Sequence, residues 1–285
     1  MTRLYERPQS LDQALDLLPQ EDWTILAGGT DIYPASAEAY AWGHPTPCHI
    51  LDVTAINSLS PIEETPEAFR IGCLATWTEL IEAELPNWFK ALRFASQEIG
   101  GVQIQNRGTL VGNICNASPA ADSVPALLVL DAAVELQAAN ETRTVPLDAF
   151  ILGNRRTVRQ PDELVTAIVI PKRGPSARST FCKLGARRYL VISIAMVAVL
   201  IETDEADRIE HARVAVGACS EVAQRLPELE ATLTGRAASM PLDDAFLEEA
   251  LTVLTPIEDA RSNAVYRQRA AQVLVSRALK EVGMA

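Results

Sequence analysis

The sequence predicts an α+β fold, in which strands and helices fall into separate groups instead of alternating along the whole chain. The chain opens with a β-α-β pattern that includes a glycine-rich turn. Its later part holds two long apolar runs on either side of an acidic turn, which is typical of a β-hairpin. Two amphipathic helices then follow. These three features occupy residues 10–53, 192–218 and 242–282.

The opening segment begins with a short helix. Ser10 is expected to cap this helix, with Gln13 as the second half of a capping box. A strand at Trp23–Ala27 then leads into the turn Gly28-Gly29-Thr30-Asp31. After an irregular stretch rich in proline, alanine and tyrosine, a second strand is predicted at His49–Val53.

A change of composition near Pro61–Pro66 predicts the start of a second lobe, and the sequence KRGPSARS at residues 172–179 predicts the linker that ends it. The elements expected between them are strands at 69–73, 134–138 and 164–170, a helix begun by Thr76 and Glu79, a helix at 87–98 and a helix at 126–130. Beyond the linker, a strand at 181–184 precedes the hairpin strands at 192–201 and 212–218. Amphipathic helices at 242–254 and 265–282 end the chain.

The charge and hydropathy of the chain exclude several partners. Its 285 residues carry a formal net charge of −12, so nucleic acid and anionic membranes are poor candidates. The N-terminus has no apolar stretch that could serve as the core of a signal peptide. The longest apolar run, Val191–Ile201, is too short to span a bilayer. A cytoplasmic location is therefore expected.

The cysteines and histidines predict no metal site. The five cysteines are odd in number and widely spaced, which argues against a disulfide framework. There is no C-x-x-C pair and no compact Cys/His cluster for zinc or an iron–sulfur cluster. The three histidines are scattered and are expected to be ordinary residues of the fold.

Two glycine-containing segments carry the signal for a ligand. The first is the turn at 27–32, where paired glycines allow close approach of the backbone and can point N–H groups at an anion. The second spans residues 100–122 and is expected to be a long polar loop, rich in Gly, Asn, Ser and Thr. A loop of this length in a compact domain is usually functional.

Common enzyme signatures are missing. The chain has no G-x-G-x-x-G fingerprint, no P-loop and no G-x-S-x-G elbow. Its carboxylates form no recognisable acid/base pair, and no catalytic residue is predicted.

The ordered motifs resemble a known family. AGGTD after a strand is followed by Q-x-x-N-x-G-T-x-x-G-N-x-x-N-A-S-P-x-x-D at residues 103–122. Further matches are Phe181-Cys182-Lys183, Ala186-Arg187-Arg188 and the segment at 261–267 before the last helix. Together they resemble the FAD-binding (medium) subunits of molybdenum hydroxylases, the family of xanthine dehydrogenase and carbon monoxide dehydrogenase.

The resemblance implies the domain organisation. A two-lobed FAD-binding domain of the PCMH type would span residues 1–173, with lobes of about 1–60 and 61–173. A C-terminal α+β domain of antiparallel sheet plus helices would span residues 178–285.

The resemblance also implies the cofactor-binding residues. The pyrophosphate of FAD would lie on the first turn and, with the ribityl chain, on the second. Hydroxyl groups of the cofactor would bond Asn116 and Asp122, its ring would contact Ile99 and Val165, and Lys183 would lie near the polar edge of the ring. The turn residues are Ala27, Gly28, Gly29, Thr30, Asp31 and Ile32 in the first, and Thr109, Val111, Gly112 and Asn113 in the second.

Among the departures from the family pattern, two concern the second turn directly. Val111 stands where relatives usually have glycine, and valine tolerates positive φ poorly. The second turn is therefore expected to differ from that of relatives, or to approach the cofactor less closely. Ala121 stands where a small polar residue often precedes the aspartate, so one hydrogen bond is expected to be missing.

The implied function is electron transfer. A small [2Fe–2S] subunit would pass electrons through FAD to NAD⁺ or another acceptor, and a large molybdopterin subunit would perform the substrate chemistry. Complexes of this family are often doubled into a dimer of heterotrimers. Two alternatives stay open: a stand-alone flavoprotein oxidoreductase, and a degenerate scaffold subunit that has lost FAD, which Val111 and Ala121 suggest.

Overall fold

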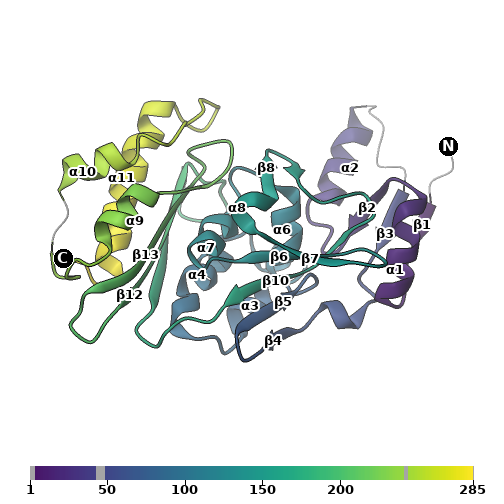
Figure 1. The fold of residues 1–285 in the computed structure, drawn as a ribbon. Coiled ribbons are helices and arrows are strands. Elements are labelled where there is room, and N and C mark those ends of the chain that lie inside the picture. The colour runs from purple at the N-terminus through teal and green to yellow at the C-terminus, as the bar shows by residue number, and fades with distance from the viewer. Residues whose placement is uncertain (1–3, 43–48, 241–242, 285) are drawn as a thin grey trace.

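The computed structural model describes residues 4–42, 49–240 and 243–284. Three sheets follow one another across the molecule, as Figure 1 shows: an N-terminal sheet at the right, a central five-stranded sheet and a C-terminal sheet at the left. The last two are antiparallel, and helices pack against all three, so the predicted α+β class is confirmed. Within the described ranges, no helix is both long and apolar enough to cross a membrane.

The N-terminal sheet is parallel and has the strand order β1-β3-β2. Ser10 caps the first helix as predicted, and its Oγ accepts a hydrogen bond from the Gln13 N–H at 3.3 Å. The capping box is only half formed, because Gln13 Oε1 accepts from the N–H of Gln9 instead of that of Ser10. The elements are β1 (Leu4–Glu6), α1 (Leu11–Leu17), a 3-10 turn (Leu18–Gln20), β2 (Trp23–Leu26), α2 (Ile32–Ala41) and β3 (His49–Asp52).

Helix α2 corrects one expectation, since its residues lie in the stretch predicted to be irregular. Four of its ten residues are alanine, the strongest helix former. Pro34 occupies the third position, in the first turn, where the missing N–H breaks no intrahelical hydrogen bond. The proline that suggested irregular structure is therefore compatible with this helix.

The central sheet has the order β4-β5-β10-β6-β7. Its predicted strands are confirmed to within two residues, whereas the short edge strands β4 and β7 carry too many polar residues to be recognised. The Thr76 capping box is complete: the Thr76 N–H donates to Glu79 Oε2 at 2.7 Å, and the Glu79 N–H donates to Thr76 Oγ1 at 3.3 Å. The strands are β4 (Ile62–Glu64), β5 (Ala68–Gly72), β6 (Ala133–Gln137), β7 (Thr142–Pro146) and β10 (Leu164–Pro171), with a small ribbon of β8 (Ile151–Gly153) and β9 (Arg156–Thr157).

Short helices cover this sheet and reach toward the C-terminal part. The segment expected as a long polar loop contains two of them, α5 and α6, so that expectation is wrong. The helices are α3 (Trp77–Glu82), a 3-10 turn (Asn87–Phe89), α4 (Lys90–Glu98), α5 (Val102–Gln105), α6 (Leu110–Asn116), α7 (Ser123–Val129) and α8 (Leu147–Phe150).

The C-terminal sheet has the order β11-β12-β13-β14, and the predicted hairpin joins its two long central strands. Arg178 and Ser179 belong to the first strand and not to the linker, because they pair with Ile201 and Leu200. The elements are β11 (Arg178–Leu184), β12 (Ala195–Thr203), β13 (Ile209–Gly217), β14 (Gln224–Arg225), α9 (Pro227–Leu233), α10 (Asp244–Ala250) and α11 (Ala264–Glu281).

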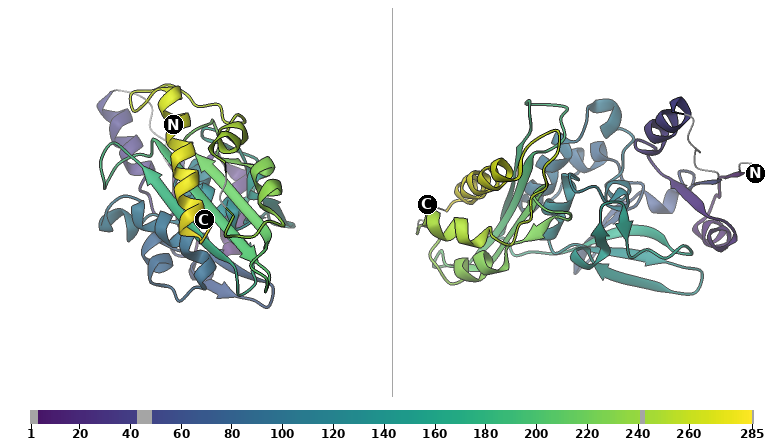
Figure 2. Two further views of the ribbon diagram at one scale, coloured as in Figure 1. Left: turned by 90° about the vertical axis from the view of Figure 1, so that its left-hand side faces the viewer. Right: turned by 90° about the horizontal axis from the view of Figure 1, so that it is seen from above.

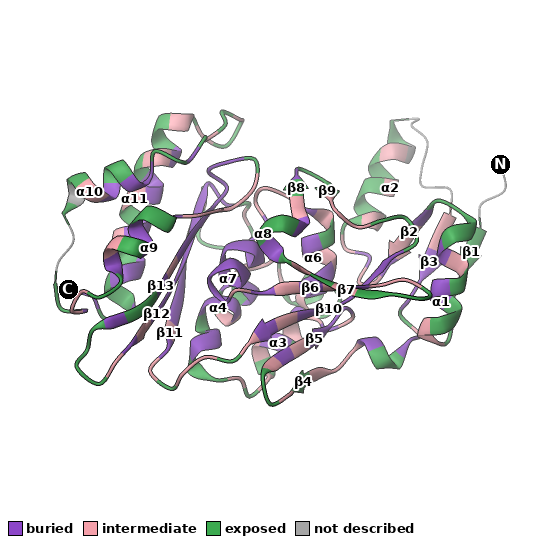
Figure 3. Cartoon of the chain, viewed as in Figure 1, coloured by how far each residue is buried: buried purple, intermediate pink, exposed green. Residues whose placement is uncertain are grey.

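Strand β12 is buried on both faces (Figure 3). Helices α4 and α7 pack on one side of its sheet, and α9 and α11 pack on the other (Figure 2). Side chains that alternate along β12 consequently enter two different cores. Met196, Ala198 and Leu200 join the core of the first 173 residues, while Ala195, Val197, Val199 and Ile201 join the C-terminal core. This double burial explains why the strand reads as an almost uninterrupted apolar run.

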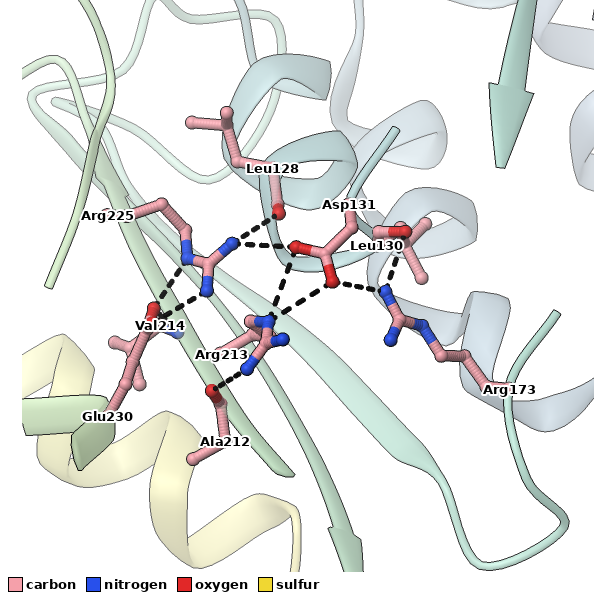
Figure 4. A network of polar contacts seen from close by, with 9 residues as sticks. All are labelled: Leu128, Leu130, Asp131, Arg173, Ala212, Arg213, Val214, Arg225 and Glu230. Atoms are coloured by element: carbon pink, nitrogen blue, oxygen red, sulfur yellow. Dashed lines mark hydrogen bonds and ion pairs between the residues drawn. The ribbon is translucent and has the colours of Figure 1, made fainter. Parts of the chain in front are cut away.

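A cluster of charges on Asp131 joins the same two parts (Figure 4). Asp131 follows α7 in a left-handed turn with φ of +50°. Its carboxylate accepts from Arg173 at 2.5 Å, from Arg225 at 2.8 Å and from Arg213 at 3.2 Å. Arg213 and Arg225 lie on β13 and β14, so this carboxylate fixes the turn after α7 to the C-terminal sheet.

The arginines outweigh the cost of burying this carboxylate. Burial alone would raise the pKa of Asp131, but the hydrogen bond from Arg173 and the charges of Arg173, Arg213 and Arg225 hold that pKa below its ordinary value. Arg225 also pairs with Glu230 at 2.5 Å, and Glu230 accepts from the N–H of Val214. The network therefore reaches from the turn after α7 to helix α9.

Replacing Asp131 with asparagine tests this network. Asparagine tolerates the left-handed backbone, so D131N removes the charge with little strain. We expect the free energy of unfolding to fall by about 1–3 kcal/mol, because three arginines lose a charged partner. A carboxyl with a lowered pKa stabilises the fold above its unfolded-state pKa and loses that effect as pH falls through its folded-state pKa. The difference from wild type should therefore be constant near neutral pH and shrink below about pH 4.

Asp207 provides the matched control for denaturant unfolding at several pH values. It also has a positive φ, of +57°, but its side chain is 62% exposed and its one ion pair, with Arg178, is 3.9 Å long. We expect D207N to change stability by less than about 0.5 kcal/mol. Equal losses for D131N and D207N would contradict a joining role for Asp131.

Candidate functional site

A cavity of about 510 Å³ lies between the N-terminal lobe and the central sheet. Its volume falls in the range of small-molecule and cofactor sites. The lining comes from β2 and the turn after it, from α6 and from the start of β10, with side chains of α3 and α5. Of the fifteen residues predicted to bind the cofactor, thirteen line this cavity: Ala27, Gly28, Gly29, Thr30, Asp31, Ile32, Ile99, Thr109, Val111, Gly112, Asn113, Asn116 and Val165.

The first turn is shaped by its two glycines, each for a different reason. Gly29 has a φ of +72°, a conformation that other residues rarely adopt. Gly28 must lack a side chain because a Cβ there would lie 2.0 Å from the carbonyl oxygen of Arg107. The turn leads directly into α2, which begins at Ile32. The first N–H groups of a helix have no intrahelical acceptor and carry partial positive charge, so this end of the cavity suits an anion.

The second turn forms the start of helix α6. Thr109 caps this helix, and its Oγ1 accepts from the N–H of Gly112 at 3.0 Å. Val111 lies in the first turn of the helix and is not among the described residues with positive φ. The positive φ that was assumed for Val111 therefore does not occur, because the residue lies in a helix, whose backbone valine readily adopts. Its side chain is buried and lines the cavity.

Asn116 links the two turns. Its Nδ2 donates to Asp31 Oδ1 at 3.3 Å, and its Oδ1 accepts from Arg155 at 3.2 Å. Both polar atoms of a residue predicted to bond cofactor hydroxyls are thus already engaged. Asn113 is different, because only its Oδ1 is engaged among the described residues, by Ser123 Oγ at 2.6 Å. Asn113 Nδ2 is therefore free to donate to a ligand.

Asp122 and Lys183 do not line the cavity. They form a buried ion pair with each other at 2.6 Å, and their side chains are 9% and 6% exposed. Asp122 also accepts from Ser193 Oγ at 2.5 Å, and Lys183 Nζ lies 3.4 Å from the carbonyl oxygen of Glu98. Burial raises the pKa of Asp122 in spite of the opposing effects of Lys183 and Ser193. The pair fastens the start of α7 and the end of α4 to β11.

Part of the lining is apolar. Ile99 and Val165 belong to it, together with Trp77 and Leu164, which the sequence did not single out. Trp77 is the first residue of α3, and the capping residues predicted this helix but not its contact with the cavity. A lining that joins apolar side chains to an anion-binding turn suits a ligand that carries both a ring system and phosphate.

Two further lining residues, Cys115 and Arg159, were missed. Cys115 is exposed where it borders the cavity, yet the surrounding protein atoms raise the pKa of its thiol to about 11, with the charge of Arg159 opposing this. The thiol is consequently neutral at physiological pH. Arg159 is held by the carbonyl oxygens of Gln160 and Glu163, at 3.0 and 2.8 Å. It comes from a segment after β9 that carries no recognisable motif.

A metal centre is not visible in the part of the chain that the structure describes, where no three His, Cys, Asp or Glu side chains cluster in a way that could hold an ion.

Comparison with known protein families gives matches over both parts of the chain. Residues 1–173 match the family described as the FAD binding domain in molybdopterin dehydrogenase. Residues 180–282 match the CO dehydrogenase flavoprotein C-terminal domain.

Individual relatives match over nearly their whole length. The medium subunit of nicotine 6-hydroxylase from Paenarthrobacter nicotinovorans is 31% identical over 98% of this chain and 96% of its own. The medium chain of carbon monoxide dehydrogenase from Hydrogenophaga pseudoflava is 29% identical over 96% and 95%. A solved structure of carbon monoxide dehydrogenase from the latter organism superposes with a TM-score of 0.87, at 28% identity, over 98% of this chain and 96% of that one.

Substituting Gly28 with alanine tests whether the two turns form the cavity. The added Cβ would meet the Arg107 carbonyl at 2.0 Å, so the turns must separate. We expect G28A to lose about 1–3 kcal/mol of stability and to retain no FAD after desalting. Gly101 is the control, because its φ is −107° and an added Cβ would find its nearest neighbour at 3.4 Å. Undiminished flavin retention in G28A, measured by absorbance, would show that FAD binds elsewhere.

Removing Lys183 tests the buried pair. K183M leaves the Asp122 carboxylate buried without its cation, and we expect a loss of about 3–5 kcal/mol in denaturant unfolding. The double variant D122N/K183M should recover part of that loss, because no unpaired charge remains. Lys172 is the control, since its 2.6 Å ion pair with Glu64 is exposed; K172M should cost about 1 kcal/mol or less. A double variant as unstable as K183M would refute the charge-pair account.

Proposed function

The chain belongs to the FAD-binding subunits of the molybdopterin dehydrogenases, and on that premise we propose that it passes electrons from an iron–sulfur subunit to NAD⁺ or another acceptor. It is an oxidoreductase component with an FAD-binding domain. The observation that carries the proposal is the cavity where the two glycine-rich turns meet, because its lining combines an anion-binding turn with apolar side chains, which suit the pyrophosphate and the ring systems of FAD.

The residues present fit this cofactor. The end formed by 27–32 and by the start of α6 offers helix N–H groups and hydroxyls to a pyrophosphate. Ile99 and Val165, which also line the cavity, offer apolar contacts to a ring system. Gly28 lets the first turn pack against the carbonyl oxygen of Arg107, in a space that a Cβ would fill.

The individual roles follow from the geometry. The pyrophosphate would be held by 27–32 with Thr109, Gly112 would allow its close approach, and Asn113 Nδ2 would donate to a hydroxyl of the cofactor. Asn116 positions the two turns through its bonds to Asp31 and Arg155, and the second N–H of its Nδ2 would donate to a hydroxyl of the cofactor. Asp122 and Lys183 are positioning residues as well. Lys183 contacts the carbonyl of Glu98, the residue before Ile99, and so helps to fix the apolar part of the lining.

When bound, FAD supplies the redox chemistry that accepts and delivers electrons. The described lining residues include few groups for acid/base chemistry. Asp31 is the one carboxylate among the described lining residues, and it accepts a hydrogen bond from Asn116. The neutral thiol of Cys115 is no nucleophile at physiological pH. These groups favour a binding and positioning subunit over a stand-alone flavoenzyme with its own substrate.

Partner subunits would carry the remaining chemistry. Relatives of similar length are named as the medium subunit of nicotine 6-hydroxylase, the FAD-subunit of nicotinate dehydrogenase and the medium chain of carbon monoxide dehydrogenase. Because such different substrates occur with one type of FAD subunit, the substrate would be selected elsewhere. We propose a small [2Fe–2S] subunit and a large molybdopterin subunit as partners, doubled into a dimer of heterotrimers.

The absorption spectrum of the purified chain tests the proposal. After incubation with FAD and desalting, we expect the bands of bound oxidised flavin to remain. Affinity purification from the native source should then bring down two further subunits that contain molybdenum and iron, measured by metal analysis. A chain that retains no flavin, either alone or within such a complex, would support the scaffold alternative and overturn the proposal.

A further inference from the structure

A second pocket of about 330 Å³ lies behind the first glycine-rich turn. We call it the back pocket. Ala27, Gly28 and Thr109 border both this pocket and the cofactor cavity, so the two turns form a wall between them. Its other lining residues do not reach the cofactor cavity. They include two arginines, Arg7 and Arg107, and among the residues that the structure describes no carboxylate lines this pocket.

The basic lining contrasts with the molecule as a whole, which carries 37 acidic and 25 basic residues. Arg107 is exposed, and among the described residues its guanidinium has no hydrogen-bond or ion-pair partner. An arginine offers five N–H donors in a planar fork that matches oxyanions. Its backbone carbonyl, by contrast, is fixed against Gly28. The backbone of Arg107 is therefore fixed in place, whereas its guanidinium has no partner among the described residues.

Arg7 adds a second cation to the lining. Its Nε lies 3.4 Å from Asp52, and one terminal nitrogen donates to Thr54 Oγ1 at 3.4 Å. Asp52 itself accepts hydrogen bonds from Tyr5 and from the Thr54 N–H and hydroxyl. These long contacts hold Arg7 in place but leave several of its donors unused.

Neutral donors complete the set. Asn106 Oδ1 accepts from Thr78 Oγ1 at 2.6 Å, so the amide of Asn106 is oriented and its Nδ2 remains a donor. Ser60 contributes a hydroxyl to the lining. A pocket with two arginine forks, an oriented amide and a hydroxyl recognises oxyanions through charge-assisted hydrogen bonds.

We propose that the back pocket is a second anion site, which binds a small phosphate-bearing molecule while FAD occupies the other side of the wall. This goes beyond the proposed function, because it adds a second ligand that is not the cofactor. The volume of the pocket reaches the lower end of the range for small-molecule sites, so there is room for a small organic group besides the phosphate.

Calorimetric titration of the FAD-loaded chain tests this site. Inorganic phosphate and glycerol phosphate are titrated separately at an ionic strength fixed with potassium chloride, so that general screening stays constant. We expect saturable binding of one equivalent, weakened about tenfold in R107Q. A tighter fit of glycerol phosphate identifies a phosphomonoester as the ligand, and equal affinities identify free phosphate. R107K should give an intermediate affinity, because it keeps the charge and loses the fork.

Arg269 provides the matched control. It is exposed on α11, far along the chain from either turn, and R269Q makes the same change of charge. We expect its phosphate affinity to stay within twofold of wild type. Flavin absorbance, recorded in parallel, shows whether each variant keeps the fold of the two turns.

Three results would overturn the proposal. They are the absence of saturable heat with either probe, equal affinities in R107Q and R269Q, and loss of phosphate binding when FAD is loaded. The last would place the phosphate in the cofactor cavity. A failure of the proposed function looks different, since the chain would then bind phosphate with Arg107 dependence but retain no flavin.

Discussion

The candidate site depends on one close contact, that of Gly28 with the carbonyl oxygen of Arg107. It brings together two turns that lie far apart in the chain. The second turn is held from the other side by segment 75–77, because the Trp77 N–H donates to Gly108 and the Leu110 N–H to Ala75, each at 3.2 Å. With this wall in place, helix α6 presents its first turn to the cavity and its neighbour Arg107 to the pocket behind. The cavity and the back pocket thus both depend on the absence of a Cβ at Gly28.

A second group of interactions fixes the scaffold that carries these turns. The apolar contacts of β12 hold α4 and α7 against the C-terminal sheet. The Asp131 cluster and the Asp122–Lys183 pair add charged contacts at two ends of α7. Since α7 follows α6 after a short connection, any movement of the C-terminal sheet would be transmitted to the second glycine-rich turn. The C-terminal domain therefore contributes to the site without lining it.

Much of the fold was accessible from the sequence because its strong elements carry local signals. The central strands, the hairpin and the last helix were recognised from apolar patterning and turn residues. Helix α2 was missed because Pro34 looked disruptive, although its place in the first turn makes it harmless. The edge strands were missed because they are short and largely exposed, so that their pairing is decided by the neighbouring strand and not by their own residues.

The sequence motifs identified both turns, because the residues of each turn are neighbours along the chain. In the structure the two turns line one cavity. The motifs could not show which side chains face this cavity. Lys183 and Asp122 carry charges that either a ligand or each other could satisfy, and only the three-dimensional arrangement shows that they pair. Arg159 reaches the cavity from a segment without a motif, and Val111 was judged on a backbone conformation that helix α6 does not require.

The double burial of β12 has a consequence for how the chain is made. On the ribosome, the first 173 residues emerge well before Ala195–Ile201, and until then the faces of α4 and α7 that contact this strand stay open to water. One hydrophobic core thus includes residues of both regions that match separate families. Completion of the cofactor-binding part waits for the last third of the polypeptide, and a nascent chain paused near residue 180 would expose an apolar surface of the kind that chaperones bind.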